Sequence, residues 1–209
     1  MKFHPNQLYH VYNQGNNHQQ IYFEDENYLF FLRKVKKYIS PYADMLCYCL
    51  MHNHFHFLII PNDEAASSSN AIIPSRSKLG NKMKGTSKVP SIIYQEKLSE
   101  SIGILLSSYT KAINKRYNQS GSLFRGKTKV KDGWIDGFVT VGGNRKHINF
   151  HAENDHAWNC FNYIHANPVE AKLVAKKTDW IYSSARDYAG MRNGKLCNIE
   201  LARRIFGIE

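Results

Sequence analysis

The sequence has little cysteine and no long apolar run. Its four cysteines form neither a dense disulfide framework nor the paired spacing of a zinc site: Cys47, Cys49, Cys160 and Cys197. Residues 1–10 lack the apolar stretch of a signal peptide. No segment approaches the roughly 18 consecutive apolar residues that a membrane span needs. We therefore expect a reduced, cytoplasmic protein that has no membrane partner.

Acidic residues are also scarce. The 209 residues include 28 Lys and Arg against 17 Asp and Glu, which gives a formal net charge of +11. Such an excess attracts polyanions and favours nucleic acid as a partner. A hydrophobic fraction of 43% with 13% aromatic residues is typical of a globular protein and excludes a disordered chain. We expect one domain over residues 1–209, without internal repeats.

Apolar periodicity predicts an alternation of strands and helices. Strand-like alternation occurs in residues 8–13, and short apolar runs occur in residues 44–50 and 55–60. The last two are separated by a short turn, so they are predicted to form an antiparallel hairpin. Helical spacing occurs in three segments: residues 24–40, 98–117 and 155–168. The third helix is expected to end at Pro168, which would begin another short helix.

Three further segments lack clear periodicity. Residues 62–90 are rich in Ser and Lys and are predicted to form a flexible basic insertion. Residues 133–151 are Gly-rich and weakly patterned, and they receive no assignment. Residues 168–209 contain the stretch WIYSSARDYAG and are predicted to form a C-terminal docking segment.

The most informative motif is CLMHNHFHFLIIP, at residues 49–61. In an extended chain His54 and His56 share one face, while Phe55 and Phe57 take the other. Neutral imidazoles bind divalent metal ions, and two on one strand supply two ligands with little ordering cost. A His-x-His pattern is weak on its own, and a packed histidine pair is the alternative.

A second polar pair lies downstream in FNYIHANPVEA. Tyr163 and Asn167 have the i,i+4 spacing that places side chains on one face of a helix. A tyrosine hydroxyl, with a reference pKa of about 10, is a poor nucleophile unless a cation helps to stabilise charge at phosphorus. Tyr163 as a core aromatic and Asn167 as a helix cap are the alternatives. Together with the histidines, the pair suggests a metal-assisted tyrosine nucleophile.

Basic residues alternate along SLFRGKTKVK. The stripe consists of Arg125, Lys127, Lys129 and Lys131, and Arg116 adds a further charge nearby in sequence. Such a stripe fits either a track for nucleic-acid phosphates or an edge strand that charge protects from aggregation. The net positive charge favours phosphate binding.

These motifs resemble a known family. HNHFHFLIIP resembles the His-hydrophobe-His signature of the HUH single-tyrosine transposases. FNYIHANPVEAKLV and WIYSSARDYAG resemble the C-terminal part of the REP-associated tyrosine transposases and their insertion-sequence relatives. The resemblance also includes YHVYNQGNNHQQIYF and SSYTKAINKRYNQSGSLFRGKTKV, and it covers most of the chain outside residues 62–90.

The resemblance implies a fold and a site. The fold would be α+β, a ferredoxin-like antiparallel sheet with helices packed on one face. Tyr163 would be the nucleophile, His54 and His56 would hold Mg2+ or Mn2+, and Asn167 would be the third ligand. Residues 13–17 and the segment from Arg116 to Lys131 are our candidates for DNA contact, and among them Asn13 is singled out.

The resemblance also implies an activity. The enzyme would cleave single-stranded DNA near hairpin or repeat ends through a 5′-phosphotyrosine intermediate and then rejoin it as a transposase. Two alternatives stay open: a noncatalytic module that binds hairpin DNA or RNA, and a metal-dependent hydrolase that uses activated water. The family includes members that act alone and dimers that exchange the tyrosine helix, so a homodimer is also open.

Overall fold

The computed structural model describes residues 3–66, 68–69, 95–132 and 156–208. Its strands are β1 (Tyr9–Gln14), β2 (Ala43–Met51), β3 (His54–Pro61), β4 (Ser68–Ser69), β5 (Gln95–Glu96) and β6 (Lys129–Asp132). Its α-helices are α1 (Asp25–Tyr38), α2 (Lys97–Arg116), α3 (His156–Glu170), α4 (Ala185–Tyr188) and α5 (Ile199–Phe206). Short 3-10 turns lie at Asn16–His18, Asp63–Ala66 and Lys177–Asp179.

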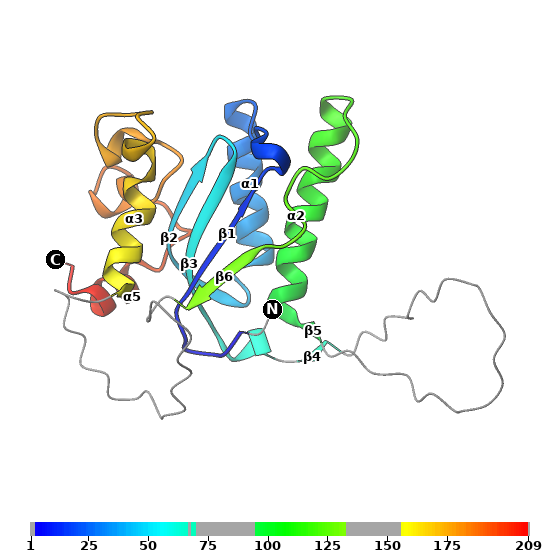
Figure 1. The fold of residues 1–209 in the computed structure, drawn as a ribbon. Coiled ribbons are helices and arrows are strands. Elements are labelled where there is room, and N and C mark those ends of the chain that lie inside the picture. The colour runs from blue at the N-terminus through cyan, green and yellow to red at the C-terminus, as the bar shows by residue number, and fades with distance from the viewer. Residues whose placement is uncertain (1–2, 67, 70–94, 133–155, 209) are drawn as a thin grey trace, which may run out of the picture.

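A four-stranded sheet forms the centre of the molecule (Figure 1). The strands lie in the order β2-β3-β1-β6, and each neighbouring pair is antiparallel. Along the chain the elements run β1-α1-β2-β3-α2-β6, which is the ferredoxin-like arrangement. The predicted α+β class and antiparallel sheet are therefore confirmed, and β3 with its two histidines lies inside the sheet.

One face of the sheet packs on α1 and α2. Phe31 of α1 lies with its ring centroid 5.4 Å from that of Phe55 on β3 and 4.9 Å from that of Tyr109 on α2. All three side chains are buried in the same apolar cluster. Burial of one such side chain contributes roughly 1.5–3 kcal/mol. This cluster fixes Phe55 and Phe57 inward and so turns the alternate residues of β3 to the opposite face.

The opposite face packs on α3 and α5, which differs from the predicted placement of helices on one face. That prediction holds for α1 and α2. Cys47, Cys49 and Leu58 are completely buried on the second face, in a cluster with Phe161 of α3 and Phe206 of α5. The central strands are apolar on both sides, so both faces require cover.

The C-terminal segment packs along β2. Leu50 N donates to Tyr182 O at 3.0 Å, and Ser184 N donates to Tyr48 O at 3.0 Å. The Trp180 indole N–H also donates to Leu50 O at 2.9 Å. These contacts give the edge strand β2 hydrogen-bonding partners that a bare edge would lack.

Two predicted boundaries differ from the structure. Residues 63–66 form a 3-10 turn in which Ala65 is buried, so the predicted insertion at 62–90 begins within the folded body. The rest of that insertion, apart from 68–69, and the unassigned stretch 133–151 lie outside the described residues. Helix α3 continues through Pro168 to Glu170. Pro168 lacks an N–H donor but lies near the helix end, where its own carbonyl accepts from Leu173 N at 2.9 Å.

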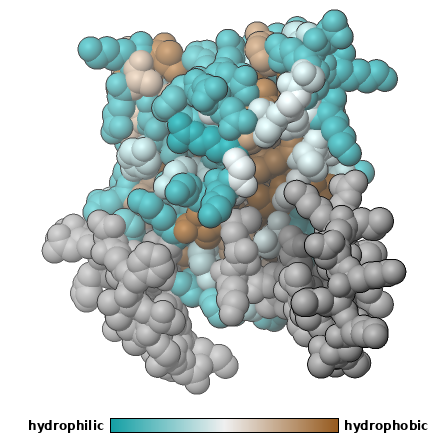
Figure 2. Space-filling view, turned by 45° about the vertical axis from the view of Figure 1, so that its right-hand side comes forward, coloured by the Kyte–Doolittle hydropathy of each residue, from teal (hydrophilic) through white to brown (hydrophobic). Residues whose placement is uncertain are grey.

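The visible surface of the described residues is mainly hydrophilic. Hydrophilic residues cover most of the face shown in Figure 2, and hydrophobic residues are visible over a smaller area. Within the described residues, no helix is long and apolar enough to cross a membrane.

Candidate active site

The two motif histidines share the α3 face of the sheet, as their spacing predicted. The ring centroids of His54 and His56 lie 5.0 Å apart with the rings nearly perpendicular. Phe55, between them, lies in the cluster with α1 and α2. His56 is buried, and His54 is half-buried at the start of β3.

Helix α3 brings Tyr163 and Asn167 to these histidines. The Tyr163 ring centroid lies 5.7 Å from that of His56. The side chain of Tyr163 is 45% exposed, so a substrate can reach it. Asn167, one turn later, is buried and donates through Nδ2 to Tyr163 O at 2.9 Å. The four residues predicted from the sequence come from two distant segments, β3 and α3, and the structure brings them together.

Burial favours the neutral form of both histidines by lowering their pKa values. It lowers the pKa of His54, although a side-chain hydrogen bond with Asn167 acts in the opposite direction. Burial lowers the pKa of His56 well below its usual value, and the neighbouring His10 and His54 lower it further. A neutral imidazole keeps one ring nitrogen with a free lone pair, which is the form that binds metal ions.

The hydrogen bonds around His54 leave its Nε2 atom unprotonated, with a lone pair that could bind a metal ion. His54 Nδ1 lies 2.6 Å from Asn53 Oδ1, while Asn53 Nδ2 donates to His18 O at 3.2 Å. The Asn53 amide is therefore oriented with its oxygen toward His54, so His54 Nδ1 carries the proton. The unprotonated Nε2 is then the ring nitrogen of His54 that is left for a ligand, and a side-chain hydrogen bond joins His54 to Asn167. One N–H of the Asn167 amide donates to Tyr163 O.

These donors fit a divalent cation. Two imidazole nitrogens are ligands typical of divalent transition-metal ions, and an amide oxygen is a ligand that Mg2+ and Mn2+ take. Among the described residues, no group of three or more His, Cys, Asp and Glu side chains is placed to hold a metal ion. The candidate set therefore depends on the Asn167 oxygen as its third protein ligand.

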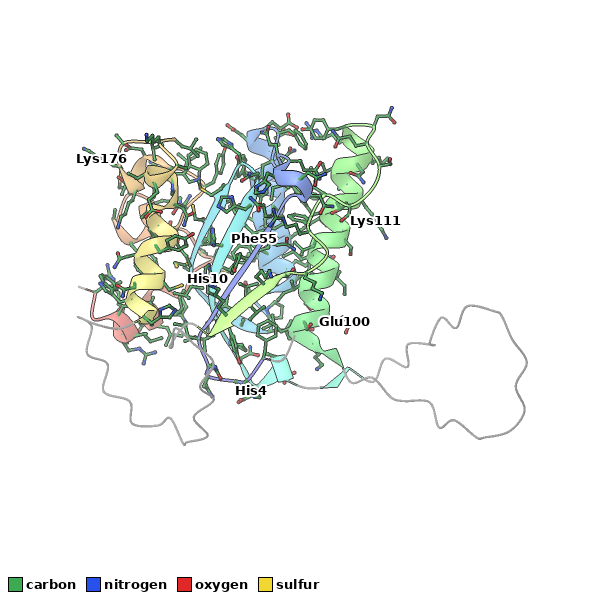
Figure 3. The ribbon with its side chains drawn as sticks, in the orientation of Figure 1. His4, His10, Phe55, Glu100, Lys111 and Lys176 are labelled. Carbon is green, nitrogen blue, oxygen red and sulfur yellow. The ribbon has the colours of Figure 1, made fainter. Side chains whose placement is uncertain are left out.

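His10 is a site residue that the sequence analysis did not identify. It lies on β1, and its Nε2 is 2.8 Å from His56 Nδ1. Burial, followed by Lys131 and His156, lowers the pKa of His10 to about 4. Figure 3 labels His10 on β1 and Phe55 on β3, which belong to opposite faces of the sheet. The alternation of His10 with Val11 was visible in the sequence, but only strand pairing shows which face meets His56.

Two of the predicted DNA contacts continue this face to the sheet edge. Lys131 of β6 is paired with His10, and Lys129 is paired with Tyr12. Directly opposed residues in an antiparallel pair point to the same face. Tyr12 is in turn paired with His56, and their rings stack with centroids 5.6 Å apart. Both lysines are exposed, so a basic edge, here called the β6 edge, leads to the histidines.

The other predicted DNA contacts lie elsewhere. Arg125 and Lys127 are exposed in the segment before β6, and Arg125 Nη2 lies 3.0 Å from His18 Nε2. Asn13 is buried, and its Nδ2 donates to Arg125 O and Thr128 Oγ1, so it anchors this segment from within. Arg116, at the end of α2, pairs with Glu24 and Glu26 at 2.7 and 3.0 Å. The structure does not bring Arg116 into the β6 edge.

Comparisons with known proteins found one similar fold among solved structures. No protein-family model matches the chain, and no curated protein matches it. Among solved structures, the chain is similar to a REP-associated tyrosine transposase bound to a REP hairpin. The TM-score is 0.55 at 10% sequence identity, over 95% of this chain and 87% of that chain. The likeness shows a shared fold, which agrees with the resemblance found in the sequence.

Proposed function

We propose that this protein is a single-tyrosine transposase that nicks and joins single-stranded DNA with hairpin or repeat ends. The observation that carries the proposal is the position of the exposed Tyr163 beside His56, one helical turn from Asn167. A packed core tyrosine would be buried, and a packed histidine pair would not need an amide oxygen beside it. The fold shared with a hairpin-bound tyrosine transposase supports the same proposal.

The proposed metal ligands are the Nε2 atoms of His54 and His56 and the side-chain oxygen of Asn167. A bound Mg2+ or Mn2+ would polarise a non-bridging oxygen of the scissile phosphate. The protein contributes neutral rings, held by burial and by hydrogen bonds to their Nδ1 atoms. Hydrogen-bonding partners behind metal-binding histidines fix the ring orientation.

Tyr163 performs the chemical step in this proposal. Its hydroxyl oxygen attacks phosphorus as the bond from phosphorus to the 3′ oxygen breaks. The hydroxyl proton leaves Tyr163, and the departing 3′ oxygen takes up a proton. The products are a 5′-phosphotyrosine and a free 3′-hydroxyl, so a later 3′-hydroxyl can reverse the reaction without a nucleotide cofactor.

The β6 edge would hold the DNA strand. Lys129 and Lys131 neutralise phosphates, and Tyr12 next to them offers an aromatic ring at the site entrance. Arg125 and Lys127 extend the positive charge toward the turn at Asn16–His18. Tyr163 and both motif histidines belong to one copy of the chain, so the proposed site is complete without a partner; the homodimer stays a prediction.

The proposal is tested by the formation of a covalent adduct. Labelled hairpin oligonucleotides and Mn2+ are incubated with the wild type, with Tyr163→Phe, and with the matched control Tyr38→Phe on α1. We expect a denaturation-resistant protein-DNA adduct in the wild type and the control only. Binding of the hairpin should survive in Tyr163→Phe, because one hydroxyl is removed with little packing volume.

The alternatives predict different results in the same experiment. A noncatalytic binding module would shift the hairpin without cleaving it. A hydrolase that uses activated water would cleave it without any adduct, and Tyr163→Phe would then remain active. Either result would overturn the nucleophile assignment.

A further inference from the structure

A buried pair of imidazoles lies behind the proposed metal site. His10 Nε2 and His56 Nδ1 are 2.8 Å apart, and their ring centroids are 5.0 Å apart. Their side chains are only 8% and 5% exposed. The Tyr12 ring lies against both, with centroids 4.9 Å from His10 and 5.6 Å from His56. The contact is thus held in place by β1, β3 and an aromatic neighbour.

Two neutral imidazoles at this distance form one N–H···N hydrogen bond, so only one of the two facing nitrogens carries a proton. If His10 Nε2 carries it, His56 Nδ1 is the acceptor and His56 Nε2 must be protonated. If His56 Nδ1 carries it, His10 Nε2 is the acceptor and His56 Nε2 keeps its lone pair. Only the second arrangement gives His56 a free Nε2 for a metal ion.

His54 shows the same arrangement with a different partner. The oriented amide of Asn53 accepts from His54 Nδ1 at 2.6 Å and leaves Nε2 unprotonated. Both motif histidines therefore have a buried or half-buried hydrogen-bonding partner at Nδ1. His10 contacts Nδ1 of His56, and Asn53 contacts Nδ1 of His54.

We propose that His10 is a positioning residue that accepts a hydrogen bond from His56 Nδ1 and thereby holds His56 Nε2 ready for the metal ion. This inference rests on the proposed function, because it assigns His56 as a ligand. His10 itself does not touch the metal or the DNA. Its role is exerted before any metal binds, through the tautomer and orientation of the His56 ring.

The tautomer is measured directly in metal-free protein by long-range proton-nitrogen NMR of the histidine rings. We expect His56 to be protonated at Nδ1 in the wild type and not at Nε2. This measurement needs neither a variant nor DNA. A His56 ring protonated at Nε2 would overturn the proposal, whether or not the protein is a transposase.

Mn2+ titrations without DNA give the second readout. His10→Phe keeps ring volume and removes the acceptor, and we expect it to weaken Mn2+ binding by roughly 10–100-fold. His10→Gln returns an acceptor oxygen near the place of Nε2 and should restore most of the affinity. His4→Phe, which removes an exposed imidazole outside the site, is the control and should bind like the wild type. Unchanged affinity in His10→Phe would overturn the proposal.

Failure of the proposal and failure of the proposed function give different patterns. With Zn2+ as a diamagnetic probe, a metal-induced nitrogen shift should appear at His56 Nε2. A shift at His10 Nε2 would make His10 a ligand and overturn its positioning role. A wild type that binds no metal but has the Nδ1–H tautomer of His56 would refute the metal site and leave the His10 hydrogen bond standing.

Discussion

His56 is the residue on which the proposed metal site depends most. It is buried, neutral and in contact with His10, His54 and Tyr163. We predict that His56→Ala loses Mn2+-dependent cleavage by more than the roughly 10–100-fold that loss of a second-shell partner costs. His4→Ala removes an exposed imidazole outside the site and is the control. An unchanged dependence of the cleavage rate on Mn2+ concentration in His56→Ala would exclude His56 as a ligand.

Cys160 gives a prediction about alkaline pH. Burial raises the pKa of the Cys160 thiol to about 12, although Lys131 acts in the opposite direction. From about pH 9 to 12 the unfolded chain has lost this proton while the folded chain keeps it. The unfolded state then binds fewer protons, so the free energy of unfolding falls as pH rises.

The contribution of this one group is about 1.4 kcal/mol per pH unit. We predict that Cys160→Ala reduces the pH dependence of the unfolding free energy by about that slope. Urea denaturation at several pH values from 9 to 10.5 measures it. Equal slopes in the wild type and Cys160→Ala would show that the thiol is not buried as described.

At the scale of elements, the β6 edge is the predicted path of the DNA strand. We predict that replacing Lys129 and Lys131 together by Ala weakens binding of single-stranded DNA and reduces the salt slope of log K by about 1.4, because each single-strand phosphate contact contributes about 0.7. The matched control replaces Lys36 and Lys37, exposed on α1, by Ala. An equal loss in both double variants would mean that net charge, rather than the β6 edge, binds the DNA.

Ser184 of the C-terminal segment connects α3 to β2 through hydrogen bonds. Ser184 Oγ accepts from Tyr48 N at 2.9 Å and lies 2.8 Å from His165 Nε2 of α3. Ser184 is completely buried. We predict that Ser184→Ala destabilises the protein by about 1–3 kcal/mol, because buried polar partners lose a hydrogen bond. Urea denaturation measures the change in unfolding free energy. A loss below about 0.5 kcal/mol, which is typical of a surface substitution, would show that these hydrogen bonds do not stabilise the fold.

These elements also show what the sequence could and could not predict. Periodicity placed β1, α1 and α2, because each has a clear apolar face, and short apolar runs placed the β2-β3 hairpin. It could not show that α3 continues past Pro168, since the helix end is held by carbonyl contacts rather than by pattern. Arg116 has acidic partners about 90 residues away in the chain, which only the contact of α2 with the start of α1 reveals.

In the candidate site, too, short sequence patterns were predictable and long-range contacts were not. His54, His56, Tyr163 and Asn167 were found because each pair has a short spacing and because the motifs resemble a known family. His10 was missed because its role depends on the register of β1 against β3. Asn13 was predicted at a DNA contact, but strand pairing buries it against the segment before β6.

At the scale of the whole molecule, the sheet separates two tasks. The face with α1 and α2 holds the main apolar cluster, and the face with α3 holds the histidines, Tyr163 and the basic edge. The Tyr163 ring is placed by a helix that packs on β2 and β3, so the proposed nucleophile and the proposed metal ligands lie on packed elements of one fold. This arrangement suits a reaction that requires an aligned phosphate.

The most direct test identifies the residue that carries DNA after the reaction. The wild type is incubated with a hairpin oligonucleotide and Mn2+, trimmed with nuclease, digested with protease and analysed by mass spectrometry. We expect a nucleotide remnant joined through its 5′ phosphate to Tyr163. A remnant on any other residue, or cleaved DNA with no modified peptide, would contradict it.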